Sequence, residues 1–399
     1  MTRDPAFEEW IEEARRVPVL QVAMALRGGG HLSPRRCRNV PCPACGGVDR
    51  FSINMNKGIF FCRKSGAAGD AIALVQHADG CDFLAAVETV TGRPAPGRDV
   101  GPAEREARRQ RAEALARERQ QEAERRSQAE NDFRAREIQR AHEIWKAGGP
   151  LPGSAAEAYL ARRGLSAAPG AKLRSLDGAK YWHNVRGAWR VLHEGPAMVG
   201  AIQGRDGRFC GCHITYIDLS TPKGKAQIHH PDTGEILDAK KMRGSAKGGY
   251  IRLGGEGRCR RLILGEGIET VYSVRQAMCD LGRDLGNTWF WSAMSLNNIG
   301  GRATAMITHP TLTTVDARGR KRAVRVAGPE PVADDSGCVM PPAEAEDIVL
   351  LGDGDSDRLT TENSLRRFAR RWAASGRTIR AAWARAGADF GDMWTEAAA

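Results

Sequence analysis

LILGEGIET (262–270) and DIVLLGDGDSD (347–357) decide the fold of the last third of this chain. Each begins with a continuous apolar run of strand length and continues into acidic residues. TWFWSAM (288–294) and TIRAAWA (378–384) predict two further strands, and amphipathic helical segments such as 361–374 separate the strands. Strands that alternate with helices predict an α/β fold with a mostly parallel sheet.

Residues 301–346 fit no element of that alternation, because they are polar and contain Pro and Gly. We expect an inserted loop or a small hairpin there. The segment after 262–265 differs, since Val271, Val274 and Met278 recur at helical spacing. That spacing predicts a helix directly after the first strand of the sheet.

Acidic residues follow three of the predicted strands: Glu266 after the first, Asp353 and Asp355 after the third, Asp389 and Asp392 after the last. Because ligands bind at the carboxyl ends of strands in open α/β sheets, these acids can converge there. Like charges in proximity raise each other's pKa, so such a pocket needs cations. Magnesium, or manganese, takes oxygen ligands, and a pair of ions can clamp the oxygens of a phosphoryl transfer. The alternative is that each acid only caps a helix.

The whole composition is that of a globular protein that meets polyphosphate. Among 399 residues, 60 Lys and Arg outnumber 48 Asp and Glu, which gives a net charge of +12. This favours a nucleic-acid partner, although a basic surface also serves solubility alone. The acidic start MTRDPAFEEW has no apolar signal core and no apolar run approaches membrane-spanning length, so we expect a cytoplasmic protein without a membrane partner. In that reducing compartment, clustered cysteines indicate a metal site rather than disulfides.

Four regions separate by composition, and they predict an α/β multidomain chain. Residues 1–95 hold short helical patterns around a cysteine-containing β ribbon, and residues 150–255 are glycine-rich with strand-like alternation. Residues 99–147 are helix formers of both charges without a sustained apolar stripe, which predicts a charged helical linker more than a coiled coil. Residues 256–399 are the α/β region.

The region before the α/β sheet contains a predicted hairpin and a basic turn. PAMVGAIQ (196–203) and FCGCHITYIDL (209–219) flank the turn GRDGR. Strand alternation places Cys210 and Cys212 on one face, away from His213, so a metal site in CGCH is not expected. Further on, four cations crowd a glycine-rich turn and could bind nucleotide or template phosphates, or simply lie in solvent. They are Lys240, Lys241, Arg243 and Lys247.

CPAC (42–45) and FFCRKS (60–65) bracket a predicted hairpin at a spacing typical of two zinc knuckles. They supply Cys42, Cys45 and Cys62, but Ser65 stands where a fourth cysteine is expected. Cys37 is the favoured fourth zinc ligand, because its basic segment could fold back onto the site. Three thiolates with water, or a ribbon without metal held by its own core, are alternatives. The other candidate ligands are His31, His77 and Cys81, and the core would be Phe51, Ile53, Phe60 and Phe61.

Cations lie beside the aromatic residues of this ribbon, Arg50 and Lys64 among them. Such a composition suits the binding of single-stranded DNA by charge and stacking. For Phe51 and Phe61, however, a place in the small core of the ribbon is the simpler expectation.

The acidic segments resemble a known family. GEGIET, LLGDGDSD and GADFGD together resemble the Toprim fold of bacterial-type DNA primases, topoisomerases and some nucleases. The resemblance implies that Glu266 is a general base or metal ligand and that Asp353 and Asp355 hold magnesium, with Asp389 and Asp392 as the last acidic motif. The chain departs from the EGxxD pattern of primases, because Thr270 occupies its last position. It also departs after the DxD pair, where Ser356 and Asp357 replace Ala-Gly.

The segment from PCPACGG to GDAIALV (41–75) closely resembles the N-terminal zinc ribbon of bacterial and phage primases, and 153–255 resembles the region before Toprim in phage and plasmid primase-like proteins. The resemblances imply a DNA primase: a zinc ribbon, a linker helix, an α+β primase subdomain and a Toprim domain, joining ribonucleoside triphosphates on single-stranded DNA. No G-x-x-x-x-G-K-[ST] loop occurs, so a separate replicative helicase is implied. A Toprim nuclease and a non-catalytic DNA-binding accessory protein are the alternatives.

Overall fold

The computed structural model describes residues 5–26, 28–34, 36–96, 102–316, 319–333, 335 and 337–398. Its contacts divide the chain into two units, Met1–Ala123 and Glu124–Ala399, which we describe separately. Within the described ranges, no helix is long and apolar enough to cross a membrane. The first residues of the predicted linker, 99–101, lie outside these ranges.

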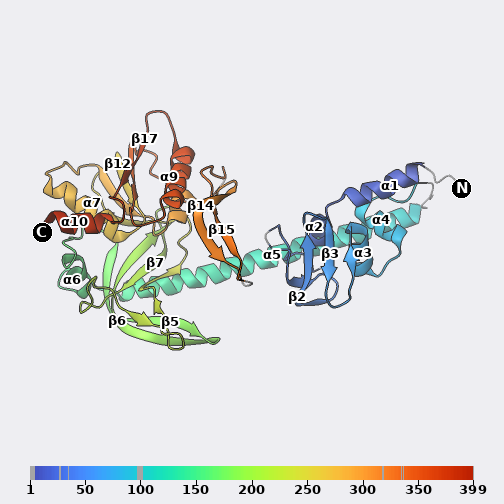
Figure 1. Ribbon diagram of the computed structural model, residues 1–399, viewed down its shortest axis with the longest axis horizontal. Helices are drawn as coiled ribbons and strands as arrows, with labels where there is room; N and C mark the ends of the chain where they lie inside the picture. The colour runs from blue at the N-terminus through green and yellow to red at the C-terminus, as the bar shows by residue number, and fades with distance from the viewer. Residues whose placement is uncertain are drawn as a thin grey trace. The chain divides into compact units, whose positions relative to one another are not determined.

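The N-terminal unit is a small antiparallel ribbon with helices around it (Figure 1). The sheet order is β1-β2-β3-β4, and Phe51 and Phe60 from its inner face stack at 5.7 Å between ring centroids. Trp10 is 1% exposed and its indole N–H donates to Thr91 Oγ1, which ties the first helix, Pro5–Arg16, to the end of the helix Phe83–Thr91. The elements are α1 Pro5–Arg16, α2 Val19–Ala25, β1 Val40–Cys42, β2 Gly46–Asn54, β3 Ile59–Cys62, β4 Ala68–Gly69, α3 Ala71–Asp79 and α4 Phe83–Thr91.

The C-terminal unit contains two larger sheets (Figure 1). The first is antiparallel with the order β10-β7-β6-β5, and a short pair, β8 with β9, lies between β7 and β10 in the chain. The elements up to β11 are α5 Pro102–Ala147, whose last residues from Glu124 belong to this unit, α6 Ala155–Ala161, β5 Leu173–Val185, β6 Ala188–Gln203, β7 Phe209–Tyr216, β8 Ile228–His229, β9 Ile236–Leu237, β10 Lys240–Gly244 and β11 Ile251–Gly254.

The second sheet confirms the mostly parallel sheet predicted for the last region. Its order is β11-β13-β12-β16-β17, with only β11 antiparallel to its neighbour. The four predicted strands are present to within two residues at their ends, and the predicted insertion contains the hairpin of β14 and β15. The elements are β12 Arg261–Gly265, α7 Ile268–Asp280, β13 Thr288–Ser292, α8 Leu296–Gly300, β14 Met306–Val315, β15 Lys321–Ala327, β16 Asp347–Gly352, α9 Arg358–Trp372, β17 Thr378–Trp383 and α10 Phe390–Ala398.

The end of the charged helix α5 does not act as a spacer. Ala141 is fully buried against the first sheet, and Ile144 and Trp145 pack beside it. Arg174 closes the helix, because its guanidinium donates to the carbonyl oxygen of Trp145 at 3.0 Å and lies 4.6 Å from the centre of the Trp145 ring. These residues of α5 therefore belong to the C-terminal unit.

One hydrophobic core continues across the predicted domain limit at 255–256. β11 ends the predicted primase subdomain, yet it pairs with β13 of the parallel sheet. Met198 and Ile202 of β6 share a buried cluster with Ile263 of β12 and Val349 of β16. The two predicted regions therefore pack as one body.

The expected strand alternation fails at Cys210. A β-bulge leaves Cys210 opposite no residue of β6, because Gln203 pairs with Phe209 while Ile202 pairs with Gly211. The bulge turns Cys210 toward one hydrophobic cluster and Cys212 into another. The two thiols are therefore not on one face, and neither belongs to a group of metal ligands found among the described residues.

Candidate active site and candidate zinc centre

Three strands of the parallel sheet deliver carboxylates to one pocket of about 460 Å³. Glu266 directly follows β12, Asp353 and Asp355 follow β16, and Asp389 precedes α10. β12 and β16 are parallel with Leu264 opposite Leu350, so their carboxyl ends are level. The pocket thus lies at the sheet edge where the sequence predicted convergence.

The charges of these acids act on one another. Burial raises the pKa of Asp353 to about 6, and the charges of Asp389 and Asp355 add to the increase although the Thr270 hydroxyl opposes it. Burial, followed by the charge of Asp353, also raises the pKa of Glu266. An all-oxygen donor set that resists ionising together fits a divalent cation such as magnesium. The oxygens are nevertheless spread out, since no three of the described carboxylates have ligand atoms within 4.8 Å of one another.

Asp392 does not line this pocket. Its backbone N–H donates to Asp389 Oδ1 at 2.6 Å, and its carboxylate lies 3.8 Å from the Lys223 ammonium. These contacts belong to the start of α10, where an acidic side chain stabilises the first turn of a helix. The expected role of Asp392 as a magnesium ligand does not fit this position.

Glu269 and Thr270 occupy the place where the chain departs from the primase pattern. The Thr270 hydroxyl lies 3.2 Å from Asp353 Oδ2 and donates to it, so it orients that carboxylate. The Glu269 side chain instead accepts a hydrogen bond from the Tyr159 hydroxyl at 2.6 Å. Its oxygens also lie 3.0 Å from the Lys225 ammonium and 3.5 Å from that of Lys240.

This buried network gives the pocket a basic wall beside the acidic one. The two lysines hold the pKa of Glu269 well below its usual range against the effect of burial, and Glu269 in turn raises that of Lys240. Burial and then Lys240 lower the pKa of His213 to about 4, so this imidazole is neutral near pH 7. Sequence patterns did not indicate Lys225 or Tyr159, and they marked His213 only as part of an unexpected metal motif, because all three come from segments distant from the acidic motifs.

Of the four cations predicted from the basic turn, Lys240 is the one that lines this pocket. Alternation along β10 turns Lys241 to the other face, where its ammonium lies 4.5 Å from the centre of the Tyr181 ring. Arg243 lines a groove beside Glu137 and the end of α5, and Lys247 is exposed beyond the strand. The predicted phosphate-binding turn is therefore reduced to Lys240 at the pocket.

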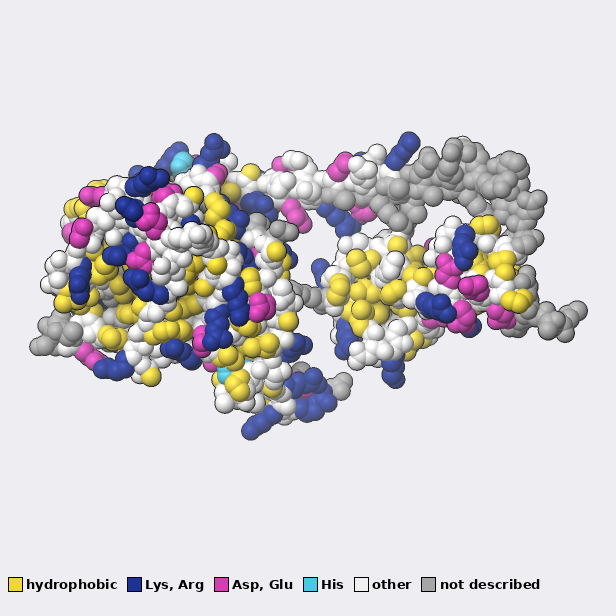
Figure 2. Space-filling view, turned by 90° about the horizontal axis from the view of Figure 1, so that it is seen from above, with side chains coloured by type: hydrophobic (Ala, Val, Ile, Leu, Met, Phe, Trp, Pro, Cys, Tyr) yellow, Lys and Arg dark blue, Asp and Glu magenta, His cyan; other side chains and the backbone are white. Residues whose placement is uncertain are grey.

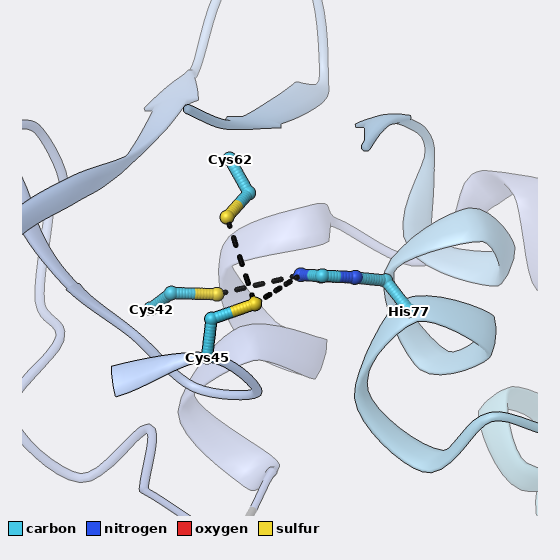
Figure 3. A group of neighbouring side chains, drawn as sticks. All are labelled: Cys42, Cys45, Cys62 and His77. Atoms are coloured by element: carbon cyan, nitrogen blue, oxygen red, sulfur yellow. Dashed lines mark hydrogen bonds between the residues drawn. The ribbon is translucent and has the colours of Figure 1, made fainter. Parts of the chain in front are cut away.

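In the ribbon, the structure gathers Cys42, Cys45, Cys62 and His77, with their ligand atoms all within 4.8 Å (Figure 3). His77 Nε2 lies 3.4 Å from Cys42 Sγ and 3.6 Å from Cys45 Sγ, and the Cys62 and Cys45 sulfurs are 3.9 Å apart. A zinc tetrahedron has edges of about 3.8 Å between sulfurs and about 3.5 Å from sulfur to nitrogen. The four side chains therefore have the spacing of a Cys3His zinc site.

His77 reaches the cluster because of how α3 begins. The Asp70 carboxylate accepts the backbone N–H of Ala73 and starts the helix next to the second knuckle. Side chains on a helix tilt toward its N-terminus, so His77 points back to the cysteines. Its ring stacks on Phe60 with 5.8 Å between centroids, which fixes its orientation.

The prediction that Cys37 is the fourth ligand is wrong. Its buried thiol lies 3.8 Å from the carbonyl oxygen of Pro34, and it is not in the group that contains Cys42. Ser65 lies beside the group without replacing a ligand. Although burial opposes it, the hydroxyl and backbone N–H of Ser65 lower the pKa of Cys62 to about 6, which favours the thiolate that zinc binds.

Phe61 does not belong to the ribbon core, contrary to expectation. Phe51 is fully buried, whereas Phe61 is 48% exposed. Phe61 pairs with Ser52 across the ribbon, and Arg50 and Arg63 follow on the same face by alternation. The outer face therefore combines an exposed aromatic ring with cations, and Lys64 is exposed next to it.

Comparisons with known families match two parts of the chain. Residues 37–72 match the zinc-binding domain of primase-helicase, and residues 135–253 match a domain of unknown function, DUF7146. The first match and the Cys3His cluster both support zinc and a primase-type ribbon. No match was found among the curated proteins.

Among solved structures, the zinc-binding and RNA polymerase domains of the Aquifex aeolicus primase align with 97% of this chain and 82% of their own, at 14% identity and a TM-score of 0.31. The DnaG catalytic core aligns with 65% of this chain and 75% of its own, at 14% identity and a TM-score of 0.35. A DNA primase domain from Pseudomonas aeruginosa aligns with 61% of this chain and 68% of its own, at 12% identity and a TM-score of 0.31. Similarities this low support no inference about activity.

Proposed function

We propose that this chain is a primase-like nucleotidyltransferase that joins ribonucleotides on a single-stranded DNA template, with its parallel sheet as a Toprim-type catalytic core. One observation carries the proposal: carboxylates from neighbouring parallel strands share a pocket with lysines, in a chain that also holds a primase-type zinc ribbon. The acids suit divalent cations and the lysines suit a polyphosphate, which are the two requirements of nucleotidyl transfer.

Glu266, Asp353 and Asp355 would hold magnesium, with Asp389 at the margin of the same pocket. When bound, the ions supply Lewis acidity to the attacking and leaving oxygens. Thr270, which donates to Asp353, would orient that carboxylate, and Glu266, which lines the same pocket, would either bind an ion or accept the proton of the 3′ hydroxyl. The chain therefore contributes position and charge rather than a covalent intermediate.

Lys240 and Lys225 are the residues that would bind the triphosphate. Their ammonium groups are held within 3.5 Å of one buried carboxylate, so their direction is fixed before substrate arrives. Preorganised cations beside metal-binding acids favour a substrate with several phosphates over a simple phosphodiester. This favours synthesis over the nuclease alternative.

The ribbon would engage the template through its outer face. Phe61 can stack on a base while Arg50, Arg63 and Lys64 follow the backbone. We further propose that the chain works with a separate replicative helicase. The family resemblance also implies a replication system of phage or plasmid type.

The test is synthesis by the purified chain with single-stranded template, labelled ribonucleotides and magnesium. We expect oligoribonucleotides from the wild type, a loss of at least about a hundredfold in Asp353→Ala, and unchanged synthesis in Asp177→Ala, whose acid is exposed on β5. Cleavage without synthesis would identify a nuclease, and DNA binding with neither reaction would identify an accessory protein. Full synthesis by Asp353→Ala would overturn the assignment of the pocket.

A further inference from the structure

The hairpin of β14 and β15 is a two-stranded arm to which the proposed function gives no role. We define the arm as residues 306–316 and 319–327. Of its residues, His309 and Val326 alone are buried, and every described residue from Pro310 to Val315 is exposed. A two-stranded ribbon exposed on both faces is not stabilised by a core of its own, so its position depends on its root.

The root of the arm is fixed to the loop that carries the catalytic acids. His309 Nδ1 accepts the backbone N–H of Leu312 at 2.9 Å, so Nε2 carries the proton and donates to Asp357 Oδ2 at 3.0 Å. Asp357 caps α9 and lies two residues after Asp355. Directly after the other strand, the Arg367 guanidinium donates to the carbonyl oxygen of Gly328 at 2.6 Å. The arm therefore starts beside the carboxylate pocket at a fixed angle.

Beyond its root, the arm is basic. The cations are on the second strand and the turn before it, and Asp316, which pairs with Arg320 and Arg322 at 3.0 and 2.9 Å, is the sole acid in 306–327. The lower edge of the C-terminal unit in Figure 2 shows a lobe crowded with Lys and Arg side chains. The arginine side chains of these pairs are more than half exposed, and ion pairs at a surface are weak, so a phosphate can compete with Asp316 for them. The described cations are Arg320, Lys321, Arg322 and Arg325.

The composition of the arm favours double-stranded over single-stranded nucleic acid as its ligand. Single strands are bound mainly by stacking of bases on aromatic rings, and residues 306–327 contain no Phe, Trp or Tyr. The first strand instead presents hydroxyls on exposed threonines, which donate to phosphate oxygens. Cations and hydroxyls without rings fit the outside of a duplex, where the phosphates are and the bases are hidden. The threonines are Thr308, Thr311, Thr313 and Thr314.

We propose that the arm lies along the sugar–phosphate backbone of a double-stranded nucleic acid beside the carboxylate pocket. Arg325 and Lys321 of the second strand pair with Thr308 and Val315 of the first and are four residues apart, which gives the ladder a length of about 13 Å at the rise of a β-strand. Each strand of a duplex carries one phosphate per roughly 3.4 Å of its axis, so the arm spans on the order of four phosphates of one backbone. That this duplex is the RNA–DNA product of synthesis rests on the proposed function, whereas the contact with a duplex does not.

The experiment measures binding of the full chain to a labelled 20-base-pair RNA–DNA hybrid, a DNA duplex of the same sequence and the matching single strand, by fluorescence anisotropy across a salt series. The test variant is Lys321→Gln, Arg322→Gln, Arg325→Gln. The control removes the same charge from exposed sites of the C-terminal unit with Arg208→Gln, Arg258→Gln, Arg283→Gln.

We expect the test variant to lose about 2 to 3 from the slope of log Kd against log salt for both duplexes and to bind them roughly tenfold more weakly, with single-strand binding and the control unchanged. An unchanged midpoint of thermal unfolding shows that the fold is intact. Unchanged duplex binding, or equal losses on single strands or in the control, overturns the proposal. If the wild type makes no primer but the test variant loses duplex binding, the proposed function is wrong and the role of the arm stands. If the wild type makes primers but the test variant binds duplexes normally, the role of the arm is wrong and the proposed function stands.

Discussion

The Cys3His cluster and the carboxylate pocket both gather side chains of types that can bind metals, but different forces hold the two groups. Cys42, Cys45, Cys62 and His77 come together within 4.8 Å, on a ribbon packed around Phe51 and Phe60. The carboxylates of the pocket stay apart, and lysines line the same pocket. Thiols and imidazole can approach one another while neutral, whereas carboxylates at neutral pH repel.

The difference in spacing fits the different roles that we propose for the two sites. A closed set of four ligands leaves a zinc ion no open position, which is the arrangement of a structural site. A spread set of carboxylates leaves room for water and substrate oxygens around each ion, which is the arrangement of a catalytic site. We therefore propose that zinc would stabilise the fold of the N-terminal unit, whereas cations in the carboxylate pocket would take part in the proposed reaction.

Removing one zinc ligand should have the largest effect of all. We expect His77→Ala to lower zinc affinity by at least about a hundredfold and to loosen the N-terminal unit, because structural zinc contributes folding free energy directly. Zinc is measured by competition with a chelating dye, and near-ultraviolet circular dichroism reports the packing. Cys37→Ser is the matched control and should keep one zinc per chain. The reverse result for the two variants would show that the cluster has been assigned to the wrong ligand.

Removing the charge that holds the lysines should have an intermediate effect, confined to the other region. We expect Glu269→Gln to raise KM for the nucleotide about tenfold with a smaller change in kcat, because Lys225 and Lys240 lose the carboxylate that positions them. Glu256→Gln, at an exposed glutamate, is the control. Because an unpaired buried charge destabilises a fold, the unfolding midpoint is measured alongside. Equal losses in both variants would remove the positioning role from Glu269.

The smallest effect concerns pH. Because the pKa of Asp353 is raised to about 6, protons compete with magnesium already at that pH. At limiting magnesium we expect synthesis to fall about tenfold per pH unit below 6, and tenfold more magnesium to move the midpoint down by about one unit. In the absence of metal, the free energy of unfolding should change with pH in the direction opposite to activity. Asp353 binds its proton more tightly in the folded state than in the unfolded state, so stability rises as pH falls from about 6 toward 4. A midpoint independent of magnesium would separate Asp353 from metal binding.

The sequence predicted well wherever the signal is local. The four strands of the parallel sheet are continuous apolar runs, and the acids beside them follow from the rule that parallel strands end at one edge. The predictions failed where tertiary packing decides which of several chemically similar residues reaches a site. Cys37 and His77 were both candidates from the sequence, and the start of α3 decided for His77. Likewise alternation along β10 left Lys240 at the pocket and turned Lys241 away.

By itself, then, the sequence determined the ribbon, the mostly parallel sheet and the place of the acids, because strand periodicity and knuckle spacing are written in neighbouring residues. Only the tertiary structure decided which histidine completes the zinc ligands and which lysines face the pocket. It also brought Glu269 to Tyr159 and Lys225, which both lie more than forty residues earlier in the chain. The tertiary structure also showed that the inserted hairpin is anchored by the hydrogen bond from His309 to Asp357. Such contacts depend on packing between distant segments, for which a single sequence carries no periodic signal.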